Sequence, residues 1–448
     1  MKKILIIVFG LSFLGVNAQK KWSLKECVDY AVKHNLQVIQ KEYSKQVQDA
    51  SLKMAKREYL PSVSGSINNT ASFGQTQFVN TSVRNDNFSN SANLGANILV
   101  YNNGRLEKNI RKTEYDVEAS QYDIEAIKND ISLQIAQQYL TTLLNKEIVK
   151  ISQAAVENAQ KQYDRAEITT KVGTTAQTVL AEAEAALAKE KQNLKTAEIN
   201  VRRSLFALAQ LLQLQEYKDF DVEDVAVSDQ LPPQLQPVNE ILNTAYETQP
   251  QIKAAESRIK SAEAQTEVNK TAFWPTITAS AGLGSFYNNR LNTNSVGVDL
   301  NGNPINERTL FQQYKDNFGQ QLGLSVNVPV FNKGITKLQV EQAKINESIA
   351  KNTLEQQKQQ VRENVQKAQF DVDANYETYL SALETEKSTK LALDFADKSY
   401  AAGKSTIYDV NIARNNYANA QGSVAQAKFN YLFSLKLLNF YAGIPLSL

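Results

Sequence analysis

Two long stretches without glycine or proline constrain what this chain can fold into. The first runs from Arg105 to Val172, and the second, equally long, runs from Ile335 to Ala402. Glycine and proline are the residues that most often end a helix, so each stretch is predicted to form one continuous helix. At a rise of 1.5 Å per residue, each helix could reach roughly 100 Å. Helices of this length exceed those of ordinary globular domains and indicate an elongated protein.

Each long stretch is followed by a second helical segment. Apolar residues recur about every 3.7 residues along both stretches, which places them in a nearly straight stripe on one helix face. The pattern resumes after Gly173 and after Gly403, where the chain is predicted to turn back on itself. The expected long helices lie at about 103–172, 175–213, 333–402 and 405–442. These patterns alone are equally compatible with a cytosolic coiled-coil rod.

The chain is predicted to be an internal tandem duplication. Near the start of each copy, two pairs of matching residues have the same separation in sequence: Ala31 with Ala245 and Pro61 with Pro275. Further on, three pairs share a longer separation: Asn102 with Asn332, Gly104 with Gly334, and Gly173 with Gly403. The change in spacing indicates an insert in the second copy near 288–317, whose sequence is typical of a solvent-exposed loop. Structural repeats are therefore expected over 19–214 and 238–448, joined by a linker over 215–237.

Four shorter segments alternate strictly between apolar and polar residues. They lie at about 60–73, 88–101, 274–288 and 317–331, two in each copy. A period of two predicts β-strands with one apolar and one polar face. Their lengths suit tilted strands that cross a membrane. A soluble β-sandwich with one wet face would show the same alternation.

Aromatic residues gather at both ends of the four strands, as the two interfaces of a membrane require. The predicted membrane girdle consists of Tyr59, Tyr101, Phe273, Trp274 and Phe331 at one end and of Phe73, Phe88, Tyr287 and Phe318 at the other. Four strands cannot cross a lipid bilayer alone, because both sheet edges would leave backbone groups unpaired in hydrocarbon. Two copies would form a barrel filled by side chains, whereas three copies would leave a lumen. We therefore expect a homotrimer with a 12-stranded β-barrel, four strands per protomer, in contact with membrane lipid.

Residues 1–18 have the features of a signal peptide. Lys2 and Lys3 precede an apolar run, and Val16-Asn17-Ala18 supplies small residues for cleavage before Gln19. The product is therefore expected to be exported. No later apolar run is long enough for a transmembrane helix.

Composition argues against several other functions. The chain has 49 Lys+Arg and 47 Asp+Glu, and this near balance gives no reason to expect nucleic acid as a partner. One cysteine and one histidine are too few for a Cys/His zinc site or a disulfide framework. The sequence shows neither a nucleophile with its base nor a phosphate-binding loop. No enzymatic activity, metal or cofactor is therefore expected.

Several motifs, in the same order in both copies, resemble the TolC family of outer-membrane factors. They are the leading helix from Leu24 to Leu36, the strand entries Leu60-Pro61 and Trp274-Pro275, the segment Val328–Gly334, and the turn Gly403–Val410. The resemblance covers essentially the whole mature chain. It implies a mixed α and β protein, with a trimeric 12-stranded outer-membrane β-barrel continued by a long periplasmic α-helical tunnel. Residues 215–237 would then form an equatorial linker around that tunnel.

The resemblance also implies a function. It indicates the outer-membrane channel of a tripartite efflux pump or a type I secretion system, in a Gram-negative bacterium. This channel would be a passive exit duct that docks to a periplasmic adaptor, or membrane fusion protein, and to an inner-membrane pump of the RND or ABC type. A secreted coiled-coil structural protein and a static barrel without transport remain the alternatives.

Two candidate sites follow from the resemblance. The turns between the long helices would be adaptor-docking tips: Gly173, Thr174, Thr175, Gly403, Lys404, Ser405 and Thr406. Simple turn and capping chemistry accounts for the same residues. Asp409 would form a periplasmic pore constriction, because threefold symmetry would bring three carboxylates together. Thr406 and Asp409 also match a capping box, so Asp409 is equally a candidate for a local helix cap.

Overall fold

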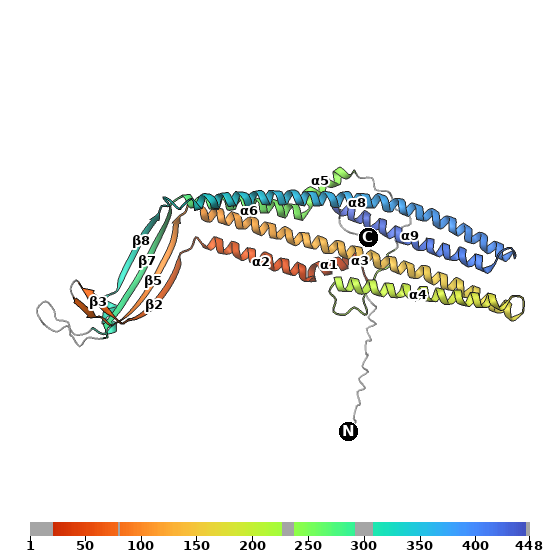
Figure 1. Ribbon diagram of the computed structural model, residues 1–448, viewed down its shortest axis with the longest axis horizontal. Helices are drawn as coiled ribbons and strands as arrows, with labels where there is room; N and C mark the ends of the chain where they lie inside the picture. Colours follow the sequence, from red (N-terminus) through yellow and green to blue (C-terminus); the bar gives the residue numbers. More distant parts are fainter. Residues whose placement is uncertain (1–20, 79–80, 226–236, 292–307, 445–448) are drawn as a thin grey trace, which may run out of the picture. The chain divides into compact units, whose positions relative to one another are not determined.

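The computed structural model describes residues 21–78, 81–225, 237–291 and 308–444 (Figure 1). The predicted signal peptide, residues 1–18, lies outside the described residues. So do parts of the predicted linker and of the predicted insert.

The four predicted strands pair into one antiparallel sheet in the order β2-β5-β7-β8 (Figure 1). Their bounds are Ser62–Ser72 for β2, Asn87–Tyr101 for β5, Thr276–Arg290 for β7 and Gly319–Asn327 for β8. The register sets apolar residues opposite one another across all four strands: Val63 pairs with Ala96, Ala96 with Ala281, and Ala281 with Leu322. Alternation along the sequence thereby becomes one continuous apolar face and one continuous polar face.

Strand β8 is shorter than the predicted segment 317–331. It ends at Asn327, two residues before Pro329. Proline has no backbone N–H and cannot donate to a neighbouring strand, so the ladder is not continued there. Val330 and Phe331, beyond the end of the strand, are both highly exposed.

Four long helices form two hairpins, one in each repeat (Figure 1). Helices α3 (Arg105–Lys171) and α8 (Ile335–Ala401) have 67 residues each, and α4 (Gln177–Leu211) and α9 (Ile407–Tyr441) have 35 each. These equal lengths agree with the predicted duplication and with a mixed α and β fold. None of the helices in the described ranges is long and apolar enough to cross a membrane.

A pair of shorter helices precedes the sheet in each repeat. They are α1 (Leu24–His34) and α2 (Leu36–Arg57) in the first repeat, and α5 (Val238–Thr248) and α6 (Pro250–Lys270) in the second. The predicted helix from Leu24 to Leu36 is interrupted at Asn35, which is extended. The Asn35 side chain accepts a hydrogen bond from the backbone N–H of Gln37 at 2.8 Å, so it caps the start of α2.

The chain divides into two compact units, and neither corresponds to one repeat. Among the described residues, one unit contains those that fall within 1–44, 121–254 and 354–448, and the other contains those within 45–120 and 255–353. Each unit therefore draws on both copies of the duplication. Two clusters of buried side chains lie in the first unit, one around Ile135, Tyr139 and Leu208 and the other around Ile241, Val361 and Leu438.

A short strand near the N-terminus is held against the linker. Strand β1 (Lys21–Trp22) pairs in parallel with β6 (Asp221–Val222), and the buried Tyr139 hydroxyl lies 3.3 Å from the backbone oxygens of Trp22 and Glu223. Lys146 on α3 donates to the Val222 carbonyl at 2.7 Å. We call this arrangement the N-terminal clasp. No periodic signal predicts it, because each strand has only two residues.

Two further features were not predicted. A small hairpin of β3 (Gln75–Phe78) and β4 (Thr81–Arg84) is formed by the segment of chain that connects β2 to β5. The expectation that the whole insert near 288–317 is an exposed loop is wrong, because it contains helix α7 (Leu310–Asp316). Thr309 and Gln312 form a capping box that starts this helix, and such short local signals are easily hidden in a polar segment.

Ion pairs strengthen the N-terminal clasp. Lys146, which is largely buried, also lies 2.8 Å from the Asp221 carboxylate and 3.0 Å from that of Asp224. Lys21 donates to Asp224 at 2.7 Å, and this hydrogen bond holds the pKa of Asp224 below its usual value. The contribution of Asp224 to stability is therefore present above the ordinary carboxyl pKa and is lost as the pH falls through the lowered pKa.

Replacing Lys146 by methionine should loosen the clasp, because the carbonyl of Val222 and two carboxylates lose their shared donor. We expect the free energy of unfolding to fall by about 1–2 kcal/mol, since Asp224 is half exposed and its pairing is screened. Urea unfolding followed by circular dichroism measures this change. Lys150→Met is the matched control: Lys150 pairs with Glu147 on the helix surface, and its loss should cost less than about 0.5 kcal/mol. Equal effects of the two substitutions would contradict the clasp.

Candidate functional site: the exposed sheet and the helical tips

The apolar face of the sheet is open to its surroundings. Several of its large side chains are highly exposed, among them Val63 at 65%, Ile67 at 73%, Leu322 at 88% and Leu324 at 69%. No second sheet within the described ranges covers them. A soluble sandwich would bury this face, so that interpretation is wrong. A continuous, exposed apolar face is expected where a protein contacts a membrane or a partner.

The opposite face of the sheet is polar, and its side chains lie in cross-strand rows. Ser62, Asn97 and Ser280 lie in one cross-strand row, which ends at Gly323. Glycines leave room for polar side chains here, because a Cβ atom at Gly284 would collide with the side chain of Asn93. Such a face can line a water-filled path.

The predicted girdle residues lie at the two ends of the strands. Tyr59, Tyr101, Phe273 and Trp274, at the ends near the helices, are about half exposed, and Phe331 is 85% exposed. At the other end, Phe73 and Phe318 are exposed, whereas Phe88 and Tyr287 are half buried and pack edge to face with ring centres 6.4 Å apart. The placement fits an interfacial role, which remains a prediction.

The predicted tips are tight turns with the same backbone geometry in both repeats. Gly173 and Gly403 have φ values of 73° and 72°, a left-handed conformation that suits glycine. The residue after each glycine closes the turn, since the Thr174 N–H donates to the Thr169 carbonyl and the Lys404 N–H donates to the Ser399 carbonyl, both at 2.9 Å. Turn chemistry therefore accounts for the two glycines, and docking remains a separate proposal.

Asp409 caps helix α9. The Thr406 hydroxyl accepts from the Asp409 N–H, and the Asp409 carboxylate accepts from the Thr406 N–H at 2.9 Å and from its hydroxyl at 2.7 Å. These hydrogen bonds, first that of the hydroxyl and then that of the backbone, lower the pKa of Asp409. The predicted capping box is thus present, and Asp409 is ionised at neutral pH.

The two tips differ in how their second helix begins. In the first repeat the N-cap of α4 is Ala176, which makes no side-chain cap, and Val179 takes the place of Asp409. Thr175 instead shares hydroxyl contacts with Thr169 at 2.9 Å and Thr170 at 3.1 Å. Only the second tip of one protomer therefore carries a fixed acidic side chain at this position.

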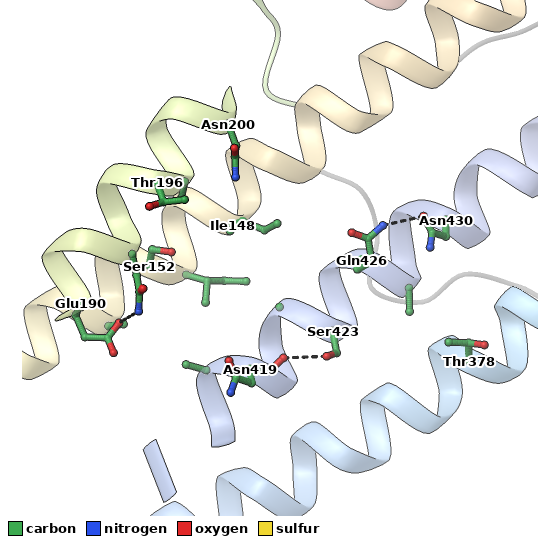
Figure 2. Close-up of a pocket in the computed structure, with 17 residues that line it drawn as sticks. Ile148, Ser152, Glu190, Thr196, Asn200, Thr378, Asn419, Ser423, Gln426 and Asn430 are labelled. Atoms are coloured by element: carbon green, nitrogen blue, oxygen red, sulfur yellow. Dashed lines mark hydrogen bonds between the residues drawn. The ribbon is translucent and has the colours of Figure 1, made fainter. Parts of the chain in front are cut away.

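A groove of about 770 Å³, lined by both polar and apolar side chains, lies between the two helical hairpins within the first compact unit (Figure 2). Residues of α3 and α4 line one side of it, and residues of α9 with Thr378 of α8 line the other. Figure 2 shows Ser423 bonded to the Asn419 carbonyl and Gln426 bonded to Asn430, so these amide and hydroxyl groups are held within their own helix. The groove was not predicted. The spacing of these polar residues along α9, three or four apart, was the available signal.

The described residues offer no group of histidine, cysteine and acidic side chains that could hold a metal ion. Cys27 is fully buried in the core, and burial raises the pKa of its thiol to about 12. It is therefore expected to be unreactive.

The sequence profile of the outer membrane efflux protein family matches residues 28–213 and 241–443. The chain belongs to this family. The family match confirms the resemblance and the predicted outer-membrane location, and it favours a channel over a secreted coiled-coil protein.

Individual relatives of this efflux family protein are distant in sequence. It is 26% identical over 309 residues to the outer membrane protein TolC of Escherichia coli (strain K12), a match that spans 67% of this chain and 59% of that relative. It is 22% identical over 412 residues to the outer membrane efflux protein BepC of Brucella suis biovar 1 (strain 1330), spanning 91% of this chain and 83% of BepC. The crystal structure of CusC matches with a TM-score of 0.75 at 18% identity, over 94% of this chain and 92% of CusC. The chain therefore has the fold of CusC.

Replacing Thr406 by alanine should loosen the first turn of α9, because the helix loses its side-chain cap. Such caps contribute about 1 kcal/mol, which corresponds to roughly fivefold faster exchange of the amide hydrogens of Asp409 and Val410. Hydrogen exchange with mass spectrometry measures this rate. The same substitution at Thr174, whose hydroxyl donates to the Thr169 carbonyl at the end of α3 and makes no cap at the start of α4, should leave exchange in α4 unchanged. Unaltered exchange in α9 of Thr406→Ala would contradict the cap.

Proposed function

We propose that three copies of this chain form a channel through the outer membrane, which serves as the exit duct of an efflux pump or type I secretion system. The main support for this proposal is the described sheet, which has an exposed apolar face and two edges without a neighbouring strand. The chain also belongs to the outer membrane efflux family.

The free edges support closure by other copies. Within the part of the chain that the structure describes, strands β2 and β8 each pair on one side only. In lipid, the unpaired N–H and C=O groups of such edges would each cost several kcal/mol. Pairing β8 of one protomer with β2 of the next satisfies both edges. Three protomers then give twelve strands around a lumen, whereas eight strands leave no passage.

Exposed apolar stripes on the helices support the same assembly. On α8, the side chains of Leu338, Ile345 and Ile349 are 56–63% exposed, and on α2 Val47 and Met54 are 62% and 63% exposed. Apolar area of this kind is stabilising when it is removed from water, by roughly 25 cal/mol per Å². Packing of these stripes between neighbouring protomers would continue the barrel as a helical tunnel on the periplasmic side.

The polar face of the sheet would line the water path. Its serine, threonine and asparagine side chains have no charge, so the duct is expected to be passive and to select little among solutes. Selection and energy would then come from partners. A periplasmic adaptor, or membrane fusion protein, would dock at the tips, and an inner-membrane pump of the RND or ABC type would supply the cargo.

Docking at the tips is tested by two substitutions of one glycine. Gly403→Ala and Gly403→Trp impose similar backbone strain, because any side chain is disfavoured at this positive φ. Only tryptophan adds bulk to the docking surface. We expect Gly403→Trp to abolish pump-dependent export and Gly403→Ala to retain most of it, with heat-resistant trimers in the outer-membrane fraction for both. Normal export by Gly403→Trp would exclude docking at this tip.

The acidic constriction is tested by single-channel conductance in planar bilayers. Three copies of Asp409 close together should bind cations, so Asp409→Asn should weaken block by divalent cations added at the periplasmic side. Thr406→Ala is the matched control, because it removes the cap but keeps the carboxylate, and it should retain the block. Unchanged block in Asp409→Asn would reject the ring, and failure of wild-type protein to conduct at all would reject the channel.

A further inference from the structure

Helix α7 seals the edge of β7 beyond Gly319, the first residue of β8. Strand β7 continues to Arg290, but its pairing with β8 stops at Gly284. Beyond that point, the Gln313 side chain accepts from the Asn288 N–H at 3.0 Å and donates to the Asn288 carbonyl at 3.1 Å. Asn317 donates to the Phe286 carbonyl at 2.8 Å. Side-chain amides thus replace the missing strand and fix α7 to the sheet.

The same attachment places α7 beside the apolar face. The Ser285 hydroxyl donates to the Tyr314 carbonyl at 2.6 Å, and Ser285 shares the apolar face with Leu283. Phe318, immediately before β8, has the same parity as Leu322 and Leu324, and so lies on that face as well.

A groove of about 640 Å³ lies on this face beside α7. Small residues form its floor, because Gly65, Ala92 and Ser285 stand in two adjacent cross-strand rows. The larger side chains around them are Ile67, Leu94, Leu283, Tyr314 and Phe318. The groove is therefore mostly apolar and has aromatic walls supplied by α7 and the residues that follow it.

The helix also exposes apolar side chains of its own. Phe311 is 83% exposed and Leu310 is 42% exposed. Tyr314, on the same helix, lines the groove itself. A water-soluble loop would not be expected to gather such residues next to an apolar groove.

We propose that this groove holds an acyl chain of a surrounding membrane lipid, with α7 as a wall that lies in the membrane interface. The proposal rests on the proposed channel, in which the apolar face contacts lipid. An acyl chain matches the groove chemically, because it covers an apolar surface without needing a hydrogen-bond partner. Phe311 would then be in contact with lipid rather than with water.

The position of α7 is tested with nitroxide labels in phosphatidylcholine vesicles. Phe311→Cys carries the label in one variant, and Phe286→Cys, at the same end of the sheet but on its polar face, carries it in the control. Cys27 is fully buried, so the unsubstituted protein measures background labelling. Collision with oxygen reports lipid, and collision with a nickel chelate reports water.

We expect the label at 311 to meet oxygen several-fold more often than the nickel chelate, and the label at 286 to show the reverse. Two results would overturn the proposal. The label at 311 could collide with the nickel chelate as often as the label at 286 does, or it could collide with neither reagent because a neighbouring protomer covers it. A label at 286 that prefers oxygen would instead contradict the water-filled channel, whatever position 311 shows.

Occupancy of the groove is tested by filling it. Gly65→Leu adds a side chain to the groove floor, where the nearest atoms lie 3.8 Å from the new Cβ. Gly95→Leu is the matched control on the polar face, where nothing lies within 4 Å of it. Native mass spectrometry of trimers purified from phosphatidylcholine vesicles counts retained lipid. Retention should fall several-fold in Gly65→Leu but not in Gly95→Leu; equal retention would overturn the proposal. Ala92→Leu fills the same floor if Gly65→Leu does not assemble.

Discussion

The backbone hydrogen bonds that β2 and β8 leave unmade along their free edges are the constraint on which the proposed assembly depends. One chain supplies a four-stranded sheet whose apolar face is exposed, and lipid tolerates such a face but not open edges. In water, the edge N–H and C=O groups could bond to solvent, but exposure of the apolar face would be unfavourable. In the proposed assembly, a closed set of copies in a membrane satisfies both requirements, and the match to the outer membrane efflux family supports that proposal.

The helical half of the protein meets a different requirement. Its long helices have narrow apolar stripes and polar remaining surfaces, so they are suited to packing side by side around a water-filled space. Glycine turns end these helices at the tips. The second tip has the capping box of Thr406 and Asp409, whereas hydroxyl contacts of Thr175 with Thr169 and Thr170 stabilise the first. The duplicated chain therefore has two kinds of tip, and the proposed partner would meet a different surface at each.

The features predicted well from the sequence were those with long, regular patterns. The stretch from Arg105 to Val172 lacks helix-breaking residues, and the strand alternation runs over ten or more positions, so both signals rise above local variation. The capping box at Thr406 was found because its two residues are only three positions apart in the sequence. Short elements such as α7 and the clasp of β1 with β6 were missed, since a few residues carry no period and depend on distant partners.

The sequence by itself determined the duplication, the long helices, the amphipathic strands and the turn glycines, because local sterics and periodic hydrophobicity specify each of them. Tertiary structure alone decided the strand order, the mixing of both repeats in each compact unit, and the sealing of β7 by Gln313. These outcomes depend on which backbone groups and side chains meet across separations of many residues. No property of a single segment encodes such meetings, because each partner's geometry is fixed only once the rest of the chain has folded.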